Sequence, residues 1–144
     1  MSNGVMFFDF DGCISNCAWR ESLLPQNKIT KGYDKFHELL GLDPPNTWII
    51  RLMNTAKVSG YKIVILTGRM EYCREASVKW LNDNFVLYDY MVMRSNDDFR
   101  HSEDYKSSIL ELYRKEDVKM VFDDMEKNIN RFKELGYPTC LVKC

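Results

Sequence analysis

The sequence predicts an α/β fold: a three-layer, Rossmann-like core with a parallel five-stranded sheet, helices on both faces and a small insert after the first strand. Apolar runs alternate along the chain with segments of helical periodicity, which is the order that builds a parallel sheet. The first, second and fourth runs lack strict apolar–polar alternation, as is typical of strands covered on both faces. The length of 144 residues suits one domain and leaves little room for a second.

Five apolar runs account for the predicted strands, and the last of them is short and weak. In chain order they are Val5–Phe8, Ile63–Leu66, Tyr90–Met93, Val118–Phe122 and Leu141–Val142. Four segments with helical spacing of apolar residues lie between them, at 48–56, 72–81, 109–113 and 125–135. Gly60 ends the first helical segment, and Gly136 followed by Pro138 ends the last.

Residues 13–46 interrupt this alternation directly after the first strand. They hold three of the four prolines of the chain, and a short helix is predicted around Tyr33–Leu40. We therefore expect a single domain over residues 1–144 with a small, cap-like insert at about 13–46. The interval from Met93 to Lys106 is too short for a second lid, so the site would admit the end of a polymer.

Composition and charge exclude several classes of protein. Hydrophobic residues make up 45% of the chain and charged residues 28%, which is an ordinary globular balance. No apolar run approaches the roughly 20 residues that a membrane span needs. The formal net charge of −1 gives no electrostatic argument for nucleic-acid binding over the whole surface, although a local basic pocket remains open.

Cysteine and histidine usage favours a cytoplasmic protein without a histidine-rich metal centre. The five cysteines are an odd number at sparse spacing, which is more typical of reduced thiols than of a secreted disulfide framework. The N-terminal stretch meets acidic residues too early for a signal peptide. His37 and His101 are the only histidines, which argues against a histidine-ligated metal or a Ser-His-Asp triad.

Two carboxylates follow the first predicted strand. Asp9 and Asp11 are alternate residues of extended chain, so both side chains can reach one site, and Gly12 allows a sharp turn behind them. Ligands of open parallel sheets bind outside the carboxyl ends of the strands, which is where this pair falls. Taken alone, the pair is more typical of a solvated acidic turn.

A second acidic pair, Asp123-Asp124, follows the fourth predicted strand. Adjacent carboxylates repel each other unless a cation lies between them. Oxygen ligands of this kind suit Mg²⁺, which keeps some of its waters and shares a substrate phosphate. The other interpretation is an ordinary helix N-terminus, where aspartate is favoured by capping and by the helix dipole.

Cationic and hydroxyl side chains are also predicted at the end of a strand and at the start of a helix. Thr67-Gly68-Arg69 is predicted to open a helix directly after the second strand, where backbone amides bind anions and Arg69 would fork onto phosphate oxygens. Lys106 is predicted to open the helix before the fourth strand and would neutralise phosphate and the crowded carboxylates. The alternatives are helix capping by Thr67 and an ordinary surface lysine. Together the four sets compose a carboxylate nucleophile, an acid–base, a metal site and phosphate-binding cations.

The chain resembles the haloacid dehalogenase (HAD) superfamily of phosphotransferases. The resemblance rests on four motifs in the same order, which are VMFFDFDG, IVILTGR, Lys106 and VFDD. The resemblance implies that Asp9 is the nucleophile and Asp11 the general acid–base. It implies that Thr67 and Lys106 hold the transferring phosphoryl group.

The same resemblance implies a Mg²⁺ site. Asp9, the backbone carbonyl of Asp11, and Asp124 would hold the ion, with Asp123 supporting it through water or Lys106.

Nearly the whole chain is similar to the 3′-phosphatase domain of phage-type polynucleotide kinase-phosphatases. This similarity rests on three segments, which are GYKIVILTGR, MVMRSNDDFRHSEDYK and VFDDMEKNINRFKELGYPTCLV. This similarity implies contacts of Arg20 and Arg69 with phosphate or with the nucleic-acid backbone. Gly68 of the TGR motif and Arg100 are further candidate phosphate-binding residues. The local cationic set consists of Arg20, Arg69, Arg94, Arg100 and Lys106. The chain departs from the usual pattern at three positions, which are Cys13, Ser102 and Met125.

The expected function is therefore a Mg²⁺-dependent phosphomonoesterase that removes 3′-phosphate from DNA or RNA ends, with a separate kinase or ligase as a partner. The alternative substrate is a small phosphomonoester such as a nucleotide or sugar phosphate. A signalling receiver domain and a HAD-fold binding module without activity are the competing classes. Trp19, beside Arg20, is expected either to stack on a base or to pack within the insert. The chain has no GxxxxGK[ST] phosphate loop, which argues against a kinase module.

Overall fold

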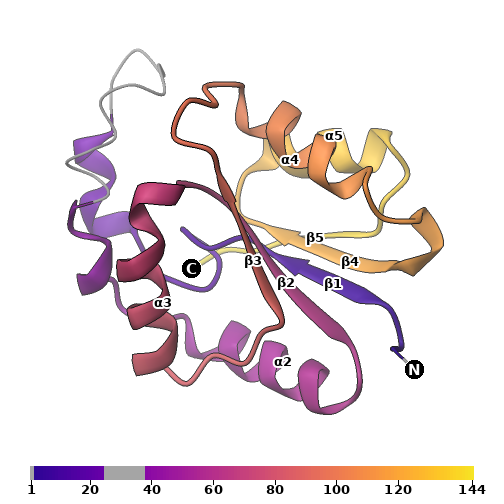
Figure 1. Cartoon of the computed structure of the whole chain (residues 1–144), viewed down its shortest axis with the longest axis horizontal. Coiled ribbons are helices and arrows are strands. Elements are labelled where there is room, and N and C mark those ends of the chain that lie inside the picture. Colours follow the sequence, from indigo (N-terminus) through magenta and orange to yellow (C-terminus); the bar gives the residue numbers. More distant parts are fainter. Residues whose placement is uncertain (1, 25–37) are drawn as a thin grey trace.

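The computed structural model describes residues 2–24 and 38–144. Five parallel strands form one sheet in the order β3-β2-β1-β4-β5 (Figure 1). The strands are β1 (Val5–Phe8), β2 (Lys62–Met70), β3 (Tyr90–Arg94), β4 (Val118–Asp123) and β5 (Thr139–Leu141). The predicted α/β class and the parallel five-stranded sheet are confirmed.

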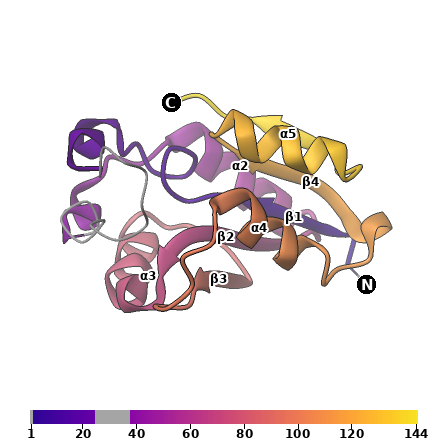
Figure 2. The ribbon, with the colours of Figure 1, turned by 90° about the horizontal axis from the view of Figure 1, so that it is seen from above.

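In the described part of the chain, four α-helices cover the two faces of the sheet (Figures 1 and 2). They are α2 (Thr47–Val58), α3 (Arg74–Asp83), α4 (Ser102–Leu110) and α5 (Glu126–Glu134). Short 3₁₀ helices lie at η1 (Ala18–Leu23), η2 (Leu40–Leu42), η3 (Glu71–Cys73) and η4 (Lys115–Asp117). No helix in the described part of the chain is long and apolar enough to cross a membrane.

Each face of the sheet has its own apolar core because successive side chains of a strand point to opposite faces. Phe8 and Ile65 belong to the core packed under α2 and α3, which includes Trp80. Phe7 and Val64, their neighbours in sequence, belong to the core that also takes Phe132 of α5 and residues of α4. This burial on both sides explains why the central strands are continuous apolar runs.

Two predictions about the elements are wrong. Thr67-Gly68-Arg69 does not open a helix, because β2 continues through Met70, which pairs with Arg94 of β3. Lys106 lies within α4 and not at its start. The length of β2 depends on its pairing with β3, which is distant in sequence, so the local sequence of β2 does not indicate where the strand ends.

The insert is only partly described. Residues 13–24 and 38–46 carry η1 and η2, and most of the helix predicted around Tyr33–Leu40 lies outside the described residues. All five cysteines are free thiols, as their odd number and spacing predict.

Replacing Phe132 by alanine tests the core beneath α5. Phe132 is fully buried, so Phe132→Ala should lower the free energy of unfolding by about 3–5 kcal/mol. Leu112→Ala is the control, because Leu112 is exposed and its loss should change stability by less than about 0.5 kcal/mol. Urea unfolding followed by circular dichroism measures both; equal stabilities would contradict the packing described.

Candidate active site

The buried side chain of Asp9 stands at the carboxyl end of β1 and is held there by Lys106. Backbone pairing continues one residue past the strand, since the Asp9 amide donates to the carbonyl of Phe122 at 2.9 Å. Lys106 Nζ donates to Asp9 Oδ1 and to Asp123 Oδ2, each at 2.7 Å. Lys106 is itself buried, so the interpretation as an ordinary surface lysine is wrong. The lysine thus joins α4 to the ends of β1 and β4.

Three carboxylates gather around this lysine. One oxygen each of Asp9, Asp123 and Asp124 lie within 4.8 Å of one another. Burial raises the pKa of Asp9, and Lys106 opposes this rise, while the neighbouring charges of Asp123 and Asp124 add to it. Burial also raises the pKa of Asp124. The cluster therefore holds more negative charge than one ammonium group compensates.

This surplus of negative charge makes the cluster suitable for a divalent cation. All three groups are oxygen donors, which Mg²⁺ prefers. Asp123 is additionally fixed, because its Oδ1 accepts the Met125 amide at 2.9 Å and the Asn128 side-chain amide at 3.2 Å. The donor set, its excess charge and its fixed orientation all fit a magnesium ion.

Gly12 allows Asp124 to approach the loop that follows β1. Gly12 has φ +79°, and a Cβ at this position would lie 2.2 Å from Asp124 Oδ2. The loop is closed by backbone bonds, in which the amides of Cys13, Ile14 and Ser15 donate to the carbonyl of Phe10. A side chain at position 12 would therefore displace Asp124 from the cluster.

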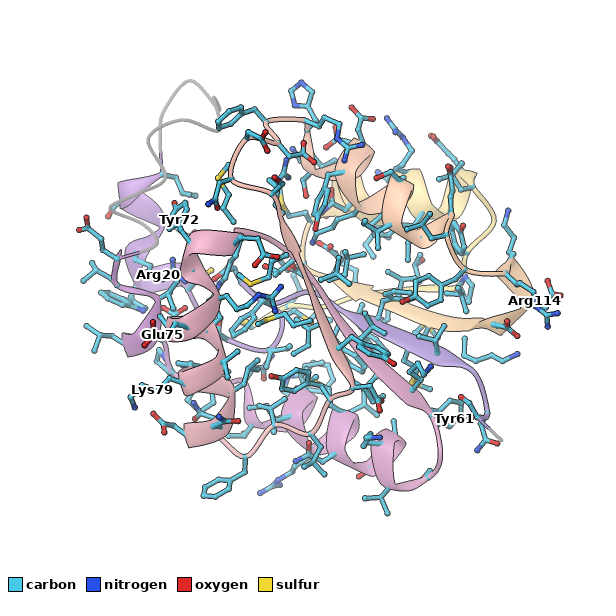
Figure 3. All side chains as sticks on the ribbon, viewed as in Figure 1. Arg20, Tyr61, Tyr72, Glu75, Lys79 and Arg114 are labelled. Atoms are coloured by element: carbon cyan, nitrogen blue, oxygen red, sulfur yellow. The ribbon has the colours of Figure 1, made fainter. Side chains whose placement is uncertain are left out.

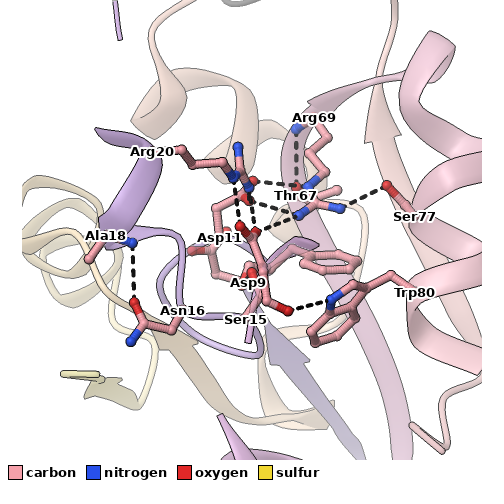
Figure 4. A network of polar contacts seen from close by, with 12 residues as sticks. Asp9, Asp11, Ser15, Asn16, Ala18, Arg20, Thr67, Arg69, Ser77 and Trp80 are labelled. Carbon is pink, nitrogen blue, oxygen red and sulfur yellow. Dashed lines mark hydrogen bonds and ion pairs between the residues drawn. The ribbon is translucent and has the colours of Figure 1, made fainter. Parts of the chain in front are cut away.

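Asp11 is bound by two arginines, Arg20 and Arg69 (Figure 4). Arg20 Nη2 donates to Asp11 Oδ1 at 2.6 Å, and Arg69 Nη2 donates to the same oxygen at 2.8 Å. Arg69 Nε reaches Asp11 Oδ2 at 3.0 Å. The two carboxyl groups that follow β1 thus have separate surroundings, one with Lys106 and one with arginines.

Both arginines are buried and firmly held. The Arg69 guanidinium lies 3.6 Å from the centre of the Phe10 ring and donates to Ser77 Oγ at 2.9 Å. Burial lowers the pKa of Arg20, but Asp43 and Asp11 outweigh this effect and raise it above the ordinary value. Direct contact of Arg20 and Arg69 with phosphate stays a prediction, because in this arrangement their side chains face Asp11.

Thr67 and Gly68 lie on the last part of β2, beside Arg69. The Thr67 hydroxyl oxygen accepts the Arg69 amide at 3.0 Å and retains its own hydrogen for donation. A Cβ on Gly68 would meet only Arg94 Nη2, at 3.7 Å, so the backbone here is open on that side. This leaves room for a ligand close to the strand.

Arg100 and Trp19 are bound by residues outside the carboxylate cluster. Arg100 is exposed and pairs with Asp98 at 2.8 Å, and it also donates to Ser108 Oγ. The Trp19 indole N–H donates to Asp43 Oδ1 at 2.9 Å while about half of the side chain stays exposed. The contact anchors Trp19 within the insert and leaves part of its ring accessible, so both of its expected roles stay open.

Three polar residues around the site were missed by sequence reasoning. Asp43 binds Arg20, Ser77 binds Arg69, and Asn128 binds Asp123. Asp43 lies in the insert, 23 residues from Arg20 along the chain. Ser77 and Asn128 lie in helices, 8 and 5 residues after the residues that they bind. Only a polar residue on the inward side of a helical pattern, as for Ser77 and Asn128, would have signalled them.

The site lies at one end of the sheet. Figure 3 shows Arg20 toward that end, together with Tyr72 and Glu75, whereas Tyr61 and Arg114 lie at the opposite end. The residues described above follow the carboxyl ends of β1, β2 and β4, which is the edge where parallel sheets bind ligands.

Comparison with solved structures gives similar folds. A chain of the Pnkp1/Rnl/Hen1 RNA repair complex is 26% identical with a TM-score of 0.76, and 96% of this chain matches 42% of that one. A second Pnkp1/Rnl/Hen1 structure gives 25% identity and a TM-score of 0.73 over 96% of this chain and 45% of that one. The chain thus spans less than half the length of these two relatives.

A more distant structure supports the fold alone. The HAD-type hydrolase YfnB from Bacillus subtilis, solved with magnesium bound, is 13% identical with a TM-score of 0.70, over 98% of this chain and 87% of that one. Comparison with curated proteins finds no significant match.

A sequence profile identifies the family. The profile described as "Polynucleotide kinase PNKP phosphatase domain" matches residues 3–144, which is nearly the whole chain. This match excludes the signalling receiver class and agrees with the carboxylates and Lys106 found at the strand ends. The chain belongs to the family of polynucleotide kinase PNKP phosphatase domains and is a HAD-type phosphatase.

Proposed function

We propose that the chain is a Mg²⁺-dependent phosphomonoesterase that removes the 3′-phosphate from nucleic-acid ends, with residues 1–144 acting as a single domain. The observation that carries the chemistry is the buried carboxylate of Asp9, held by Lys106 beside Asp123 and Asp124. A carboxylate fixed at a strand end, beside an ammonium group and a candidate metal site, is suited to nucleophilic attack on phosphorus.

The reaction would run in two steps on this chain. An oxygen of Asp9 bonds to phosphorus as the bond to the leaving alcohol breaks, and Asp11 gives its proton to the departing oxygen. Water then attacks phosphorus, the bond to Asp9 breaks, and Asp11 takes a proton from that water. Lys106 binds Asp9 Oδ1 and orients the carboxylate for the first step.

The phosphoryl group would be held by groups at the end of β2. The Thr67 hydroxyl and the open backbone at Gly68 supply hydrogen-bond donors, and Arg69 lies beside them. Asp9, Asp124 and the backbone carbonyl of Asp11 would bind Mg²⁺, with Asp123 in support. When bound, the ion supplies positive charge that keeps Asp9 ionised and neutralises phosphoryl oxygens.

Two observations support a polynucleotide end as the substrate. The family is that of polynucleotide kinase phosphatase domains, and relatives at 25–26% identity belong to an RNA repair complex. A separate kinase or ligase is accordingly the proposed partner. With a net charge of −1, binding would depend on the terminal phosphate more than on the length of the backbone.

The nucleophile is tested by Asp9→Asn. The amide has nearly the same shape but cannot attack phosphorus, so turnover should fall by about 10⁴-fold or more while circular dichroism stays unchanged. Asp83→Asn is the matched control, since Asp83 is an exposed residue of α3 and its change should leave activity intact. Activity of Asp9→Asn near the wild-type rate would remove Asp9 from this role.

Metal binding is tested without an activity assay. Mg²⁺ bound to the folded cluster should raise the unfolding temperature with increasing concentration, because the ion binds only the folded state. Asp124→Asn should abolish most of this rise, whereas Asp117→Asn, an exposed residue of η4, should preserve it. A rise of the same size in Asp124→Asn would place the ion elsewhere.

Substrate preference is tested by phosphate release from three substrates at equal concentration. We expect a higher kcat/KM for a 3′-phosphorylated oligonucleotide than for the 5′-phosphorylated oligonucleotide or a mononucleotide, and chelation of Mg²⁺ should stop all release. Equal values for the three would reject the end-processing function and favour a phosphatase of small phosphomonoesters.

A further inference from the structure

Asp43, at the end of η2 in the insert, is a buried carboxylate outside the metal cluster. Its side chain is fully shielded from solvent. Asp43 Oδ1 accepts from Arg20 Nε at 2.7 Å and from Trp19 Nε1 at 2.9 Å, and Oδ2 accepts from Arg20 Nη2 at 2.5 Å. Its backbone carbonyl accepts the Trp80 indole N–H of α3 at 2.9 Å. Asp43 is therefore fixed by both the insert and the core.

The two hydrogen bonds that Arg20 donates to Asp43 fix the orientation of the Arg20 side chain. Two nitrogens of the guanidinium are bound by Asp43, and Nη2 also reaches Asp11 Oδ1 at 2.6 Å. Bidentate pairing of this kind restricts the plane of the guanidinium as well as its position. The second arginine on Asp11, Arg69, contacts Ser77 and the Phe10 ring, and its Nη2 also lies 3.8 Å from Asp43 Oδ2. Asp43 therefore contacts both arginines that bind Asp11, and it binds Arg20 more closely.

We propose that Asp43 is a positioning residue, which acts through Arg20 to hold the carboxyl of Asp11 in line with the leaving oxygen. This inference rests on the proposed function, in which the proton of Asp11 passes to the leaving alcohol as the phosphorus–oxygen bond breaks. Asp43 binds neither substrate nor metal in this scheme. It is needed because a misplacement of about 1 Å lowers the rate of a group transfer by about 10²-fold.

The inference predicts that the effect of losing Asp43 depends on the leaving group. An alkyl alcohol leaves only when a proton reaches its oxygen, whereas 4-nitrophenolate leaves as a stable anion and needs none. Loss of Asp43 removes the carboxylate that orients Arg20 and also faces Arg69 at 3.8 Å, so the two arginines no longer hold Asp11 in line. The step that requires the proton is then slowed, and attack by Asp9 on a nitrophenyl ester is not.

The test is a single-turnover measurement with excess enzyme and Mg²⁺ on two substrates, a 3′-phosphorylated oligonucleotide and 4-nitrophenyl phosphate. Asp43→Asn should slow alcohol release about 10- to 100-fold and nitrophenolate release less than about threefold. Asp43→Glu keeps the negative charge opposite Arg20 but moves it by one methylene, so the same selective loss is expected if Asp43→Asn fails to fold. Asp89→Asn is the control, because it breaks a structural ion pair with Lys57 and should leave the ratio of the two rates unchanged.

Equal losses on both substrates, or no loss on either, in folded Asp43 variants would overturn the positioning role. A purely structural role would lower both rates together. The proposed function fails by a different result, which is a wild-type protein that releases no phosphate from the 3′-phosphorylated oligonucleotide.

Discussion

The ammonium group of Lys106, buried between Asp9 and Asp123, is the interaction on which the rest of the site depends. Two buried carboxylates at the ends of neighbouring strands repel each other unless a cation lies between them. Burial lowers the pKa of Lys106, but Asp123 and Asp9 outweigh this effect and raise it, so the lysine stays charged. The lysine belongs to α4, which lies on one face of the sheet. Its contacts with Asp9 and Asp123 therefore require that α4 is correctly packed on the strands beneath it. Packing of α4 and α5 on β1 and β4 therefore supports the chemistry as well as the stability.

A second group of charged side chains, formed by Asp11 and two arginines, lies beside the group around Lys106 and makes separate interactions. Asp11 is bound by Arg20 and Arg69, whereas Asp9 is bound by Lys106. Two carboxylates two residues apart thus receive different partners, which is how neighbouring groups are assigned nucleophilic and acid–base roles. The insert takes part in this division, because Asp43 holds Arg20.

The fold could be predicted from the sequence because its main signals are local. Val5–Phe8 and Val118–Phe122 are apolar runs of strand length, and α5 carries a clear helical stripe. The carboxylates and Lys106 could be named because each stands near a predicted strand end or helix. The extension of β2 through Met70 could not, because the pairing of Met70 with Arg94 of β3 is set by a distant segment. Asp43 escaped for the same reason, since it lies 23 residues from Arg20 and only the fold brings the two together. Ser77 and Asn128 lie 8 and 5 residues after their partners, but their positions in helices do not indicate which residues they bind.

The central claim is that Asp9 forms a covalent bond to the transferred phosphoryl group. It is tested most directly by rapid quenching of the wild-type enzyme during turnover, followed by borohydride reduction and peptide mapping. Borohydride converts an aspartyl-phosphate to homoserine, so the account predicts homoserine at position 9 and unmodified Asp11, Asp123 and Asp124. An enzyme that turns over substrate under these conditions with Asp9 unmodified and another carboxylate reduced would contradict the account.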